Sequence, residues 1–235
     1  MDILQIKNLE KSFGEKKIID NVSFNVKSGK IVGLLGKNGS GKTTIIKMIN
    51  DLLTIDGGEI LINGEKVSEK TKAIVSYLPE RTYLDNTKTI TEVFDYFEDF
   101  YSDFDRKKAE ELLKDLDLDI NARLAKMSKG MKEKVQLILV MSRRAKLYIL
   151  DEPLGGVDPS TRDYIMMTIL SSFGEDSSII ITTHLIADVE KILDEVIFID
   201  KGKIVLKGNA DKLRQKENAS INEIFRRKVK WWRNY

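Results

Sequence analysis

The stretch that decides the fold is Gly36-Lys37-Asn38-Gly39-Ser40-Gly41-Lys42-Thr43. It fits the pattern G-x-x-x-x-G-K-[S/T], and it lies directly after the apolar run Ile31–Leu35 and before the helical stretch Thr44–Leu53. Glycines let a backbone turn tightly and bring its N–H groups close to phosphate oxygens, and the helix N-terminus adds a favourable dipole. The sequence therefore predicts a strand, a phosphate-binding loop and a helix in succession.

This loop is expected to hold a nucleotide by its phosphates. Lys42 would reach the β- and γ-phosphates, and the Thr43 hydroxyl would ligate Mg²⁺. Nucleotide contacts are expected from Gly36, Lys37, Asn38, Gly39, Ser40, Gly41, Lys42, Thr43 and Thr44.

A second apolar strand ends in two carboxylates, Asp151 and Glu152, after Leu147–Leu150. The simpler interpretation is that these are two solvated acids at a strand end without a functional role. A buried carboxylate pair is costly without partners, and a divalent cation and a reacting water supply them. With the glycine loop upstream, the pattern predicts that Asp151 holds Mg²⁺ and that Glu152 polarises the attacking water.

The remaining periodicity indicates an α/β chain with a helical insertion. Runs without clean alternation predict strands that are covered on both faces of a largely parallel sheet. Helical spacing takes over from about 81 to 143, where apolar residues recur at one face. Strands are expected at Ile3–Ile6, Val22–Val26, Lys30–Leu35, Glu59–Ile62, Leu147–Leu150 and Ser178–Thr182, with a hairpin of Val196–Asp200 and Lys203–Lys207. The expected helical stripes are Val93, Phe97, Phe100, Phe104 and Ala109, Leu112, Leu113, Leu116.

Composition limits the classes of function. The chain has 235 residues, no cysteine and a single histidine, His184, which excludes a disulfide framework and a multi-histidine metal centre. The longest charge-free runs have 11 residues, too short for a membrane-spanning helix. Five of the positive charges lie in 226–235, so the rest of the chain is slightly acidic and nucleic acid is not an expected partner.

In their order along the chain, these residues resemble the nucleotide-binding domains of ATP-binding-cassette transporters, over nearly the whole sequence. Four further landmarks carry the resemblance. By that resemblance, Phe13 would stack on adenine, and Ser128 and Gly130 in Met127–Met131 would contact the γ-phosphate of ATP held by an opposite subunit. Asp158 would lie in a loop at the dimer crossing, and His184 would contact the γ-phosphate as a switch.

The resemblance also implies an architecture and partners. It implies a P-loop NTPase (RecA-like) core with an N-terminal antiparallel β subdomain and an inserted α-helical subdomain, the cassette covering 1–225 and a basic aromatic tail 226–235. Two such chains, identical or related, would enclose two ATP molecules with Mg²⁺. Separate transmembrane subunits would carry the cargo, with this chain peripheral at the cytoplasmic face of the membrane.

Two departures from the commonest family pattern point to a subgroup. The segment Met127–Met131, which corresponds to the signature of the family, carries Lys129 and Met131 where glycine and glutamine are usual. Glu80 follows Tyr77-Leu78-Pro79 where a glutamine is usual. These variants resemble drug, antimicrobial-peptide and lipid exporters. Glu80 would stand near Mg²⁺ with a charge where the family usually has a neutral ligand.

Other interpretations exist for the chain and for its landmarks. A soluble cassette ATPase of translation or DNA repair, a P-loop kinase or GTPase, and a nonhydrolysing cassette are the competing classes. Each landmark taken alone also fits a structural role: Phe13 and His184 as core residues, Ser128 and Asp158 as helix starts. It is their joint order that favours the transporter cassette.

The C-terminal segment has a recognisable helix start. Ser220 and Glu223 have capping-box spacing and predict a helix that runs into the basic tail. Clustered cations beside Trp231 and Trp232 suit an anionic membrane surface, and packing on the cassette or solvation are the alternatives.

Overall fold

The computed structural model describes residues 1–174 and 176–229. Within these ranges the N-terminal part forms an antiparallel sheet with the strand order β2-β1-β4-β5. The expected antiparallel β subdomain is confirmed, with its two long strands extending well beyond the short apolar runs that predicted them. The strands are β1 (Asp2–Phe13), β2 (Lys16–Lys27), β4 (Gly57–Ile62) and β5 (Glu65–Lys66).

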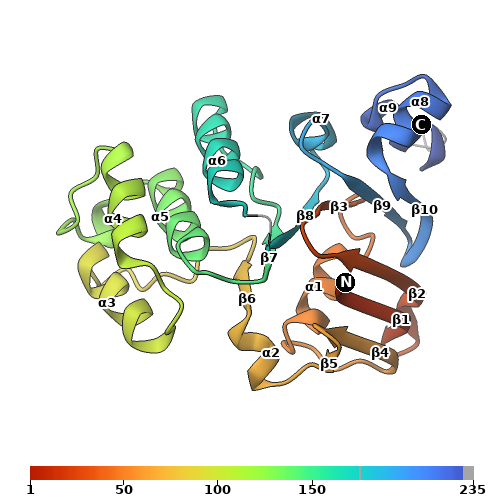
Figure 1. The fold of residues 1–235 in the computed structure, drawn as a ribbon, viewed down its shortest axis with the longest axis horizontal. Helices are drawn as coiled ribbons and strands as arrows, with labels where there is room; N and C mark the ends of the chain where they lie inside the picture. Colours follow the sequence, from red (N-terminus) through yellow and green to blue (C-terminus); the bar gives the residue numbers. More distant parts are fainter. Residues whose placement is uncertain (175, 230–235) are drawn as a thin grey trace.

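A second sheet forms the centre of the molecule (Figure 1). Its order is β10-β9-β3-β8-β7-β6, with parallel pairing throughout except for the antiparallel edge pair β9 and β10. The hairpin predicted at Lys201 and Gly202 is confirmed, and both residues have positive φ, 48° and 75°. The strands are β3 (Ile31–Leu35), β6 (Val75–Leu78), β7 (Leu147–Asp151), β8 (Ser178–Thr183), β9 (Glu195–Asp200) and β10 (Lys203–Asn209).

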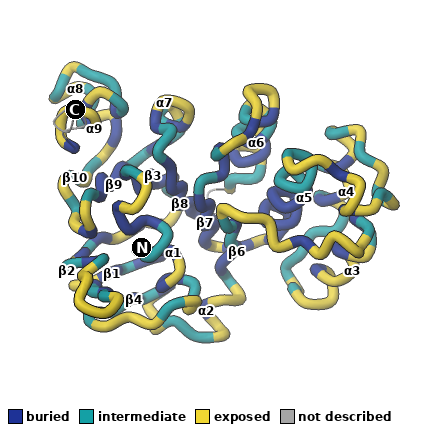
Figure 2. The backbone as a smooth tube through the Cα atoms, turned by 180° about the vertical axis from the view of Figure 1, so that it is seen from behind, coloured by how far each residue is buried: buried dark blue, intermediate teal, exposed yellow. Residues whose placement is uncertain are grey.

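Two hydrophobic cores cover the two faces of this sheet. Leu34 and Ile149 lie in the core that includes helix α1, whereas their neighbours Leu35 and Leu150 lie in the core on the opposite face. Every residue of β3, β7 and β8 is therefore buried, as Figure 2 shows, and this explains the absence of alternation in the sequence. The covering helices are α1 (Lys42–Ile49), α2 (Glu69–Ala73), α6 (Pro159–Ser172), α7 (Ile186–Val189), α8 (Ala210–Glu217) and α9 (Ile221–Lys228).

The expected helical insertion is confirmed as a subdomain with its own core. Figure 1 shows its helices at the end of the molecule away from the antiparallel sheet. The aromatic stripe was partly wrong, because α3 ends at Phe100, which is 64% exposed, and Phe104 lies beyond the helix. Phe104 instead returns to pack edge-on against Phe94, with ring centroids 6.0 Å apart. The helices are α3 (Ile90–Phe100), α4 (Arg106–Asp115), a 3₁₀ turn (Leu124–Lys126) and α5 (Lys129–Met141).

The C-terminal helix is continuous with the cassette. The capping box predicted at Ser220 and Glu223 is present, and Phe225 and Val229 are buried in the core on the sheet face opposite α1. The expected boundary at residue 226 therefore falls inside α9. The expectation for Lys230, Trp231, Trp232 and Arg233 lies outside the described residues. Within the described ranges, no helix combines the length and the apolar composition needed to cross a membrane.

Candidate functional site

The glycine loop is held in a conformation that its glycines make accessible. Gly41 has φ 110°, and a Cβ there would come within 2.6 Å of the Ile19 side chain. Helix α1 begins directly after it at Lys42, two residues earlier than the sequence pattern indicated, and ends at Ile49 instead of Leu53. The loop is also held by a hydrogen bond from a distant residue, because the Gly202 N–H donates to the Ser40 carbonyl at 3.0 Å. The loop therefore exposes its tip at Asn38 and Gly39, whereas Ser40, just before the start of α1, is buried and held by Gly202.

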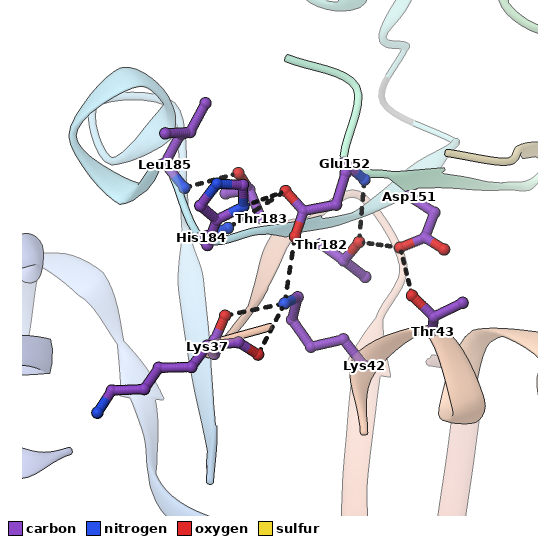
Figure 3. A network of polar contacts seen from close by, with 10 residues as sticks. Lys37, Lys42, Thr43, Asp151, Glu152, Thr182, Thr183, His184 and Leu185 are labelled. Atoms are coloured by element: carbon purple, nitrogen blue, oxygen red, sulfur yellow. Dashed lines mark hydrogen bonds and ion pairs between the residues drawn. The ribbon is translucent and has the colours of Figure 1, made fainter. Parts of the chain in front are cut away.

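Lys42 is the cation of this loop and is 5% exposed. Its ammonium donates to the Gly36 carbonyl at 2.8 Å and to the Lys37 carbonyl at 3.3 Å. It also lies 3.2 Å from an oxygen of Glu152 (Figure 3). The side chain therefore folds back over the loop, where a phosphate group would meet it. Thr43 and Thr44 follow in the first turn and are half-buried.

Asp151 lies at the end of β7 and is 1% exposed. Its Oδ1 accepts from the Thr182 hydroxyl and, at 3.4 Å, from the Thr43 hydroxyl. Burial raises the pKa of this carboxyl, and the two hydroxyl groups oppose that rise. Its other oxygen, Oδ2, is buried without a hydrogen-bond partner among the described residues. An orphaned carboxylate oxygen beside a threonine hydroxyl fits a hard cation such as Mg²⁺.

Glu152 follows in a left-handed conformation with φ 51°, which is rare for glutamate. Its N–H donates to the Thr182 carbonyl at 3.0 Å and to the Thr182 hydroxyl at 3.1 Å. Its Oε2 lies 2.9 Å from Nδ1 of His184. The turn thus directs the carboxylate between Lys42 and His184, as Figure 3 shows.

Thr182 is a site residue that sequence reasoning missed. Its side chain contacts both acids, and it pairs with Asp151 in the register of β7 and β8. The available signal was its position two residues before His184, at the end of the strand that was expected to lie in the same sheet.

Glu80 lies near the two acids. It is exposed, and it lines a small cavity of about 30 Å³ together with Asp151, Glu152 and Gln136. Its negative charge adds to the burial that raises the pKa of Asp151. Glu80 therefore lies within electrostatic reach of the proposed metal position.

The other landmarks lie elsewhere on the chain. Phe13 ends β1 and is 54% exposed, with the Lys11 ammonium 5.6 Å from its ring centroid. Ser128 caps α5 by accepting from the Met131 N–H at 3.2 Å, and Asp158 caps α6 by accepting from the Thr161 N–H at 3.0 Å. Ser128 and Asp158 therefore both act as helix N-caps, which is the structural role that each of them also fits when taken alone. In the described part of the chain, neither is in hydrogen-bond contact with Lys42 or Asp151.

Gly130 lies in the first turn of α5, directly behind the Ser128 cap. Within the described ranges, a Cβ added to Gly130 would meet no atom within 4 Å. This end of the helix is therefore an open surface.

The strand β3, a phosphate-type loop, the helix α1 and the carboxylate-ended strand β7, which is separated from β3 by β8 in the same sheet, define a P-loop nucleotide hydrolase. The comparisons then give the family. The model of the ABC transporter family matches residues 19–155, which is more than half of the chain. The chain belongs to this family as an ATP-binding cassette, and its members hydrolyse ATP to power transport.

Individual relatives cover almost all of the chain. The ABC transporter ATP-binding protein YtrB of Bacillus subtilis is 29% identical, over 95% of this chain and 77% of its own length. The lantibiotic transport ATP-binding protein SrtF of Streptococcus pyogenes is 32% identical, over 95% and 98% respectively. A solved structure of an ATP-binding subunit of an ABC transporter superimposes with a TM-score of 0.86 at 28% identity, covering 95% of this chain and 98% of that one.

Proposed function

We propose that this chain is the ATP-hydrolysing subunit of an exporter, and that two copies, or one copy and a related cassette, close around two ATP molecules. The observation that carries the proposal is the position of the Glu152 carboxylate between Lys42 and His184, at 3.2 Å and 2.9 Å. A carboxylate held there is placed to act on a water beside the terminal phosphate.

The chemistry follows from the groups at hand. The N–H groups of the loop and Lys42 would hold the phosphates, and Thr43 and Asp151 would hold Mg²⁺, with Glu80 nearby. A bound Mg²⁺ neutralises charge on the phosphates. Glu152 would accept a proton from the attacking water. The oxygen of that water would bond to the γ-phosphorus while the bond between the γ-phosphorus and the ADP oxygen breaks. His184 would donate a hydrogen bond to a γ-phosphate oxygen.

Binding of Mg²⁺ would require ligands from the nucleotide as well as from the protein. Among residues 1–174 and 176–229, no three histidine or acidic side chains are arranged to hold an ion by themselves. Mg²⁺ in phosphate-transfer enzymes is commonly held by one or two carboxylates and the substrate phosphates, with waters completing the shell. Asp151 and the Thr43 hydroxyl suit that arrangement.

The signature residues support a shared site. The N-terminus of α5, at Ser128, offers N–H groups to an anion, and the surface at Gly130 is open for a close approach. A second chain in antiparallel orientation would bring its ATP to this end of α5. Asp158 would then lie close to the dimer crossing, and hydrolysis would remove the γ-phosphate that joins the two chains.

Membrane partners are proposed from the relatives and from one surface. Proteins similar to this chain include SrtF, named for lantibiotic transport, and Nod factor export ATP-binding protein I of Burkholderia orbicola, which is 31% identical over 94% of this chain and 76% of its own length. A cleft of about 890 Å³ lies between the main sheet and the helical subdomain, lined in part by the exposed aromatics Tyr83, Tyr96 and Phe100. This cleft suits an apolar segment of a transmembrane subunit, which would hold the cassette at the cytoplasmic face of the membrane.

Mixing two inactive variants tests the shared site. Lys42→Ala disables the phosphate loop, and Ser128→Arg blocks the signature, so each pure dimer has no intact site. A mixed dimer has one intact site, formed by the loop of one chain and the signature of the other. An equal mixture should recover roughly a quarter of wild-type turnover, because half of randomly paired dimers are mixed.

Continued inactivity of the mixture, with both variants folded and able to dimerise with wild type, would contradict the shared site. Co-purification from detergent-solubilised membranes separates an exporter from a soluble cassette of translation or repair. An exporter cassette brings transmembrane subunits with it.

A further inference from the structure

A buried amide lies in the middle of helix α5. Gln136 is 2% exposed. Its Nε2 donates to the Pro79 carbonyl at 3.3 Å, and its Oε1 accepts from the Tyr83 N–H at 3.2 Å. One side chain therefore ties both ends of the segment 79–83 to the helix. A leucine of similar size would fill the space and make neither bond.

The tied segment carries Glu80. Glu80 and Gln136 line the same cavity of about 30 Å³ as Asp151 and Glu152. The segment follows β6 and leads into the helical subdomain, so it is the first connection between the two parts of the cassette. Its backbone position decides where the Glu80 carboxylate lies relative to the proposed metal ligand Asp151.

The helix itself links this segment to the signature. Gln136 lies eight residues after Ser128, so about 12 Å of helix separates the amide from the helix N-terminus. Close to its C-terminal end, α5 is held to β6 by a separate bond, which the Ser76 hydroxyl donates to the Val140 carbonyl at 2.9 Å. The Gln136 bonds are therefore not needed to attach the helix to the sheet.

We infer that Gln136 is a positioning residue for ATP hydrolysis, which fixes the Glu80 segment to α5 so that the Glu80 carboxylate keeps its place when the signature end of the helix engages a nucleotide. The inference rests on the proposed role of Glu80 beside the nucleotide and its metal. It adds a residue that acts through Glu80 and does not itself touch the nucleotide.

Gln136→Leu is the direct test. Turnover should fall roughly tenfold while the KM for ATP stays within about twofold, because the phosphate loop is untouched and only a group acting during hydrolysis is misplaced. Hydrogen exchange of the segment 79–83 should become faster in the protein without nucleotide, since the Tyr83 N–H loses its acceptor. Gln136→Met also fills the space and makes neither bond, so it should give a similar loss of turnover and similarly faster exchange, and it serves if the leucine variant does not fold.

Two comparisons make the test specific. Ser76→Ala removes a buried bond between α5 and β6 without touching the Glu80 segment, and it should leave both turnover and exchange in 79–83 within about twofold of wild type. In a Glu80→Ala background, Gln136→Leu should lower turnover by less than a further twofold, because its effect passes through Glu80.

The inference would be overturned if the turnover losses of Glu80→Ala and Gln136→Leu multiplied fully in the double variant. It would also be overturned if Ser76→Ala lost as much turnover as Gln136→Leu, or if hydrogen exchange in 79–83 were unchanged in Gln136→Leu. An inactive wild-type chain would instead overturn the proposed function.

Discussion

Glu152 lies within reach of two different partners, with its carboxylate oxygens 3.2 Å from Nζ of Lys42 and 2.9 Å from Nδ1 of His184. Its left-handed backbone is held by two hydrogen bonds from its N–H to Thr182. Strained non-glycine residues of this kind cluster at functional sites, where the surrounding structure holds them in place. Substitution of single residues therefore tests the chemistry of this site directly.

Glu152→Gln should keep ATP binding and lose turnover. An amide of nearly the same shape leaves the loop and Lys42 in place but cannot accept the proton of the attacking water, so turnover should fall by about 10²-fold or more. ATP should then accumulate in a dimer. Phosphate release and size-exclusion chromatography with saturating ATP check both results.

Glu133→Gln is the matched control for that substitution, because Glu133 lines the same small cavity and pairs with Lys129 at 3.5 Å. It should retain turnover within about threefold. A monomer of Glu152→Gln at saturating ATP, or hydrolysis at the wild-type rate, would reject the assignment of Glu152.

His184→Ala should lower turnover by about 10–10² fold with little change in ATP affinity, because a hydrogen bond to the γ-phosphate is most valuable as charge moves in the transition state. His184 is the single histidine of the chain, so its imidazole signals are unambiguous in NMR spectra. They should differ between complexes with ADP and with a nonhydrolysable ATP analogue. Unchanged turnover would leave His184 as a structural residue that packs against Glu152.

At the scale of elements, the ends of helices and strands position the site. Asp158 caps α6 and accepts from both the N–H and the hydroxyl of Thr161, at 3.0 Å and 2.7 Å. Hydrogen bonds from the hydroxyls of Ser160 and Thr161 hold the pKa of Asp158 below its ordinary value of 3.8. The cap therefore fixes the helix start at the loop that is proposed to lie near the dimer crossing.

This pKa predicts a pH dependence of stability. Because the pKa is lower in the folded chain, ionised Asp158 contributes stability that is fully present above the unfolded pKa and is lost as pH falls through the folded pKa. Asp158→Ala should lower the melting temperature by about 2–4 °C at pH 7, and its difference from wild type should shrink below about pH 4.

Asp158→Asn is the control for the charge, since asparagine caps a helix but does not ionise. Its melting temperature should be closer to that of wild type than the melting temperature of the alanine variant is. The difference between Asp158→Asn and wild type should not become smaller at low pH. Melting followed by circular dichroism from pH 3 to pH 8 measures all three chains. A constant difference between Asp158→Ala and wild type across that range would show that the ionised carboxylate contributes nothing.

At the scale of the whole molecule, three hydrophobic cores among residues 1–174 and 176–229 hold the parts together. The helical subdomain has a core of its own, and the main sheet separates the other two. Helix α9 closes one of them with Phe225, whose ring meets that of Phe198 edge-on at 5.2 Å between centroids. Its exposed face carries Arg226, Arg227 and Lys228, which precede the last residues of the chain.

That basic end is predicted to bind an anionic membrane surface. Each positive charge near such a surface contributes on the order of 1 kcal/mol, and indole rings favour the interface. Both tryptophans, Trp231 and Trp232, belong to this segment and lie outside the described residues, so intrinsic fluorescence reports on it without a label. Anionic liposomes should shift the emission to the blue, and high salt should reverse the shift by screening.

Liposomes of zwitterionic lipid are the control and should leave the spectrum as it is in buffer. An unchanged spectrum with anionic liposomes in excess at low salt would assign the tail to packing or to partner docking.

The sequence by itself determined the features whose signals are local. The glycine loop, the carboxylates at the end of β7, the hairpin at Lys201 and Gly202 and the capping box at Ser220 each depend on residues within a few positions of one another. Their backbone preferences act over the same short range, so spacing and residue type were enough to predict them. The roles of the site residues in nucleotide binding stay predictions until the variants are measured.

Only the tertiary structure decided which distant groups meet. Strand β6 has just four residues, and its place at the edge of the main sheet comes from pairing with β7. The contact of Thr182 with Asp151 spans 31 positions and that of Gln136 with Pro79 spans 57. No local pattern carries such pairs, because they exist only after burial of the apolar strands and helices has brought remote segments together and left each buried polar group to find its partner there.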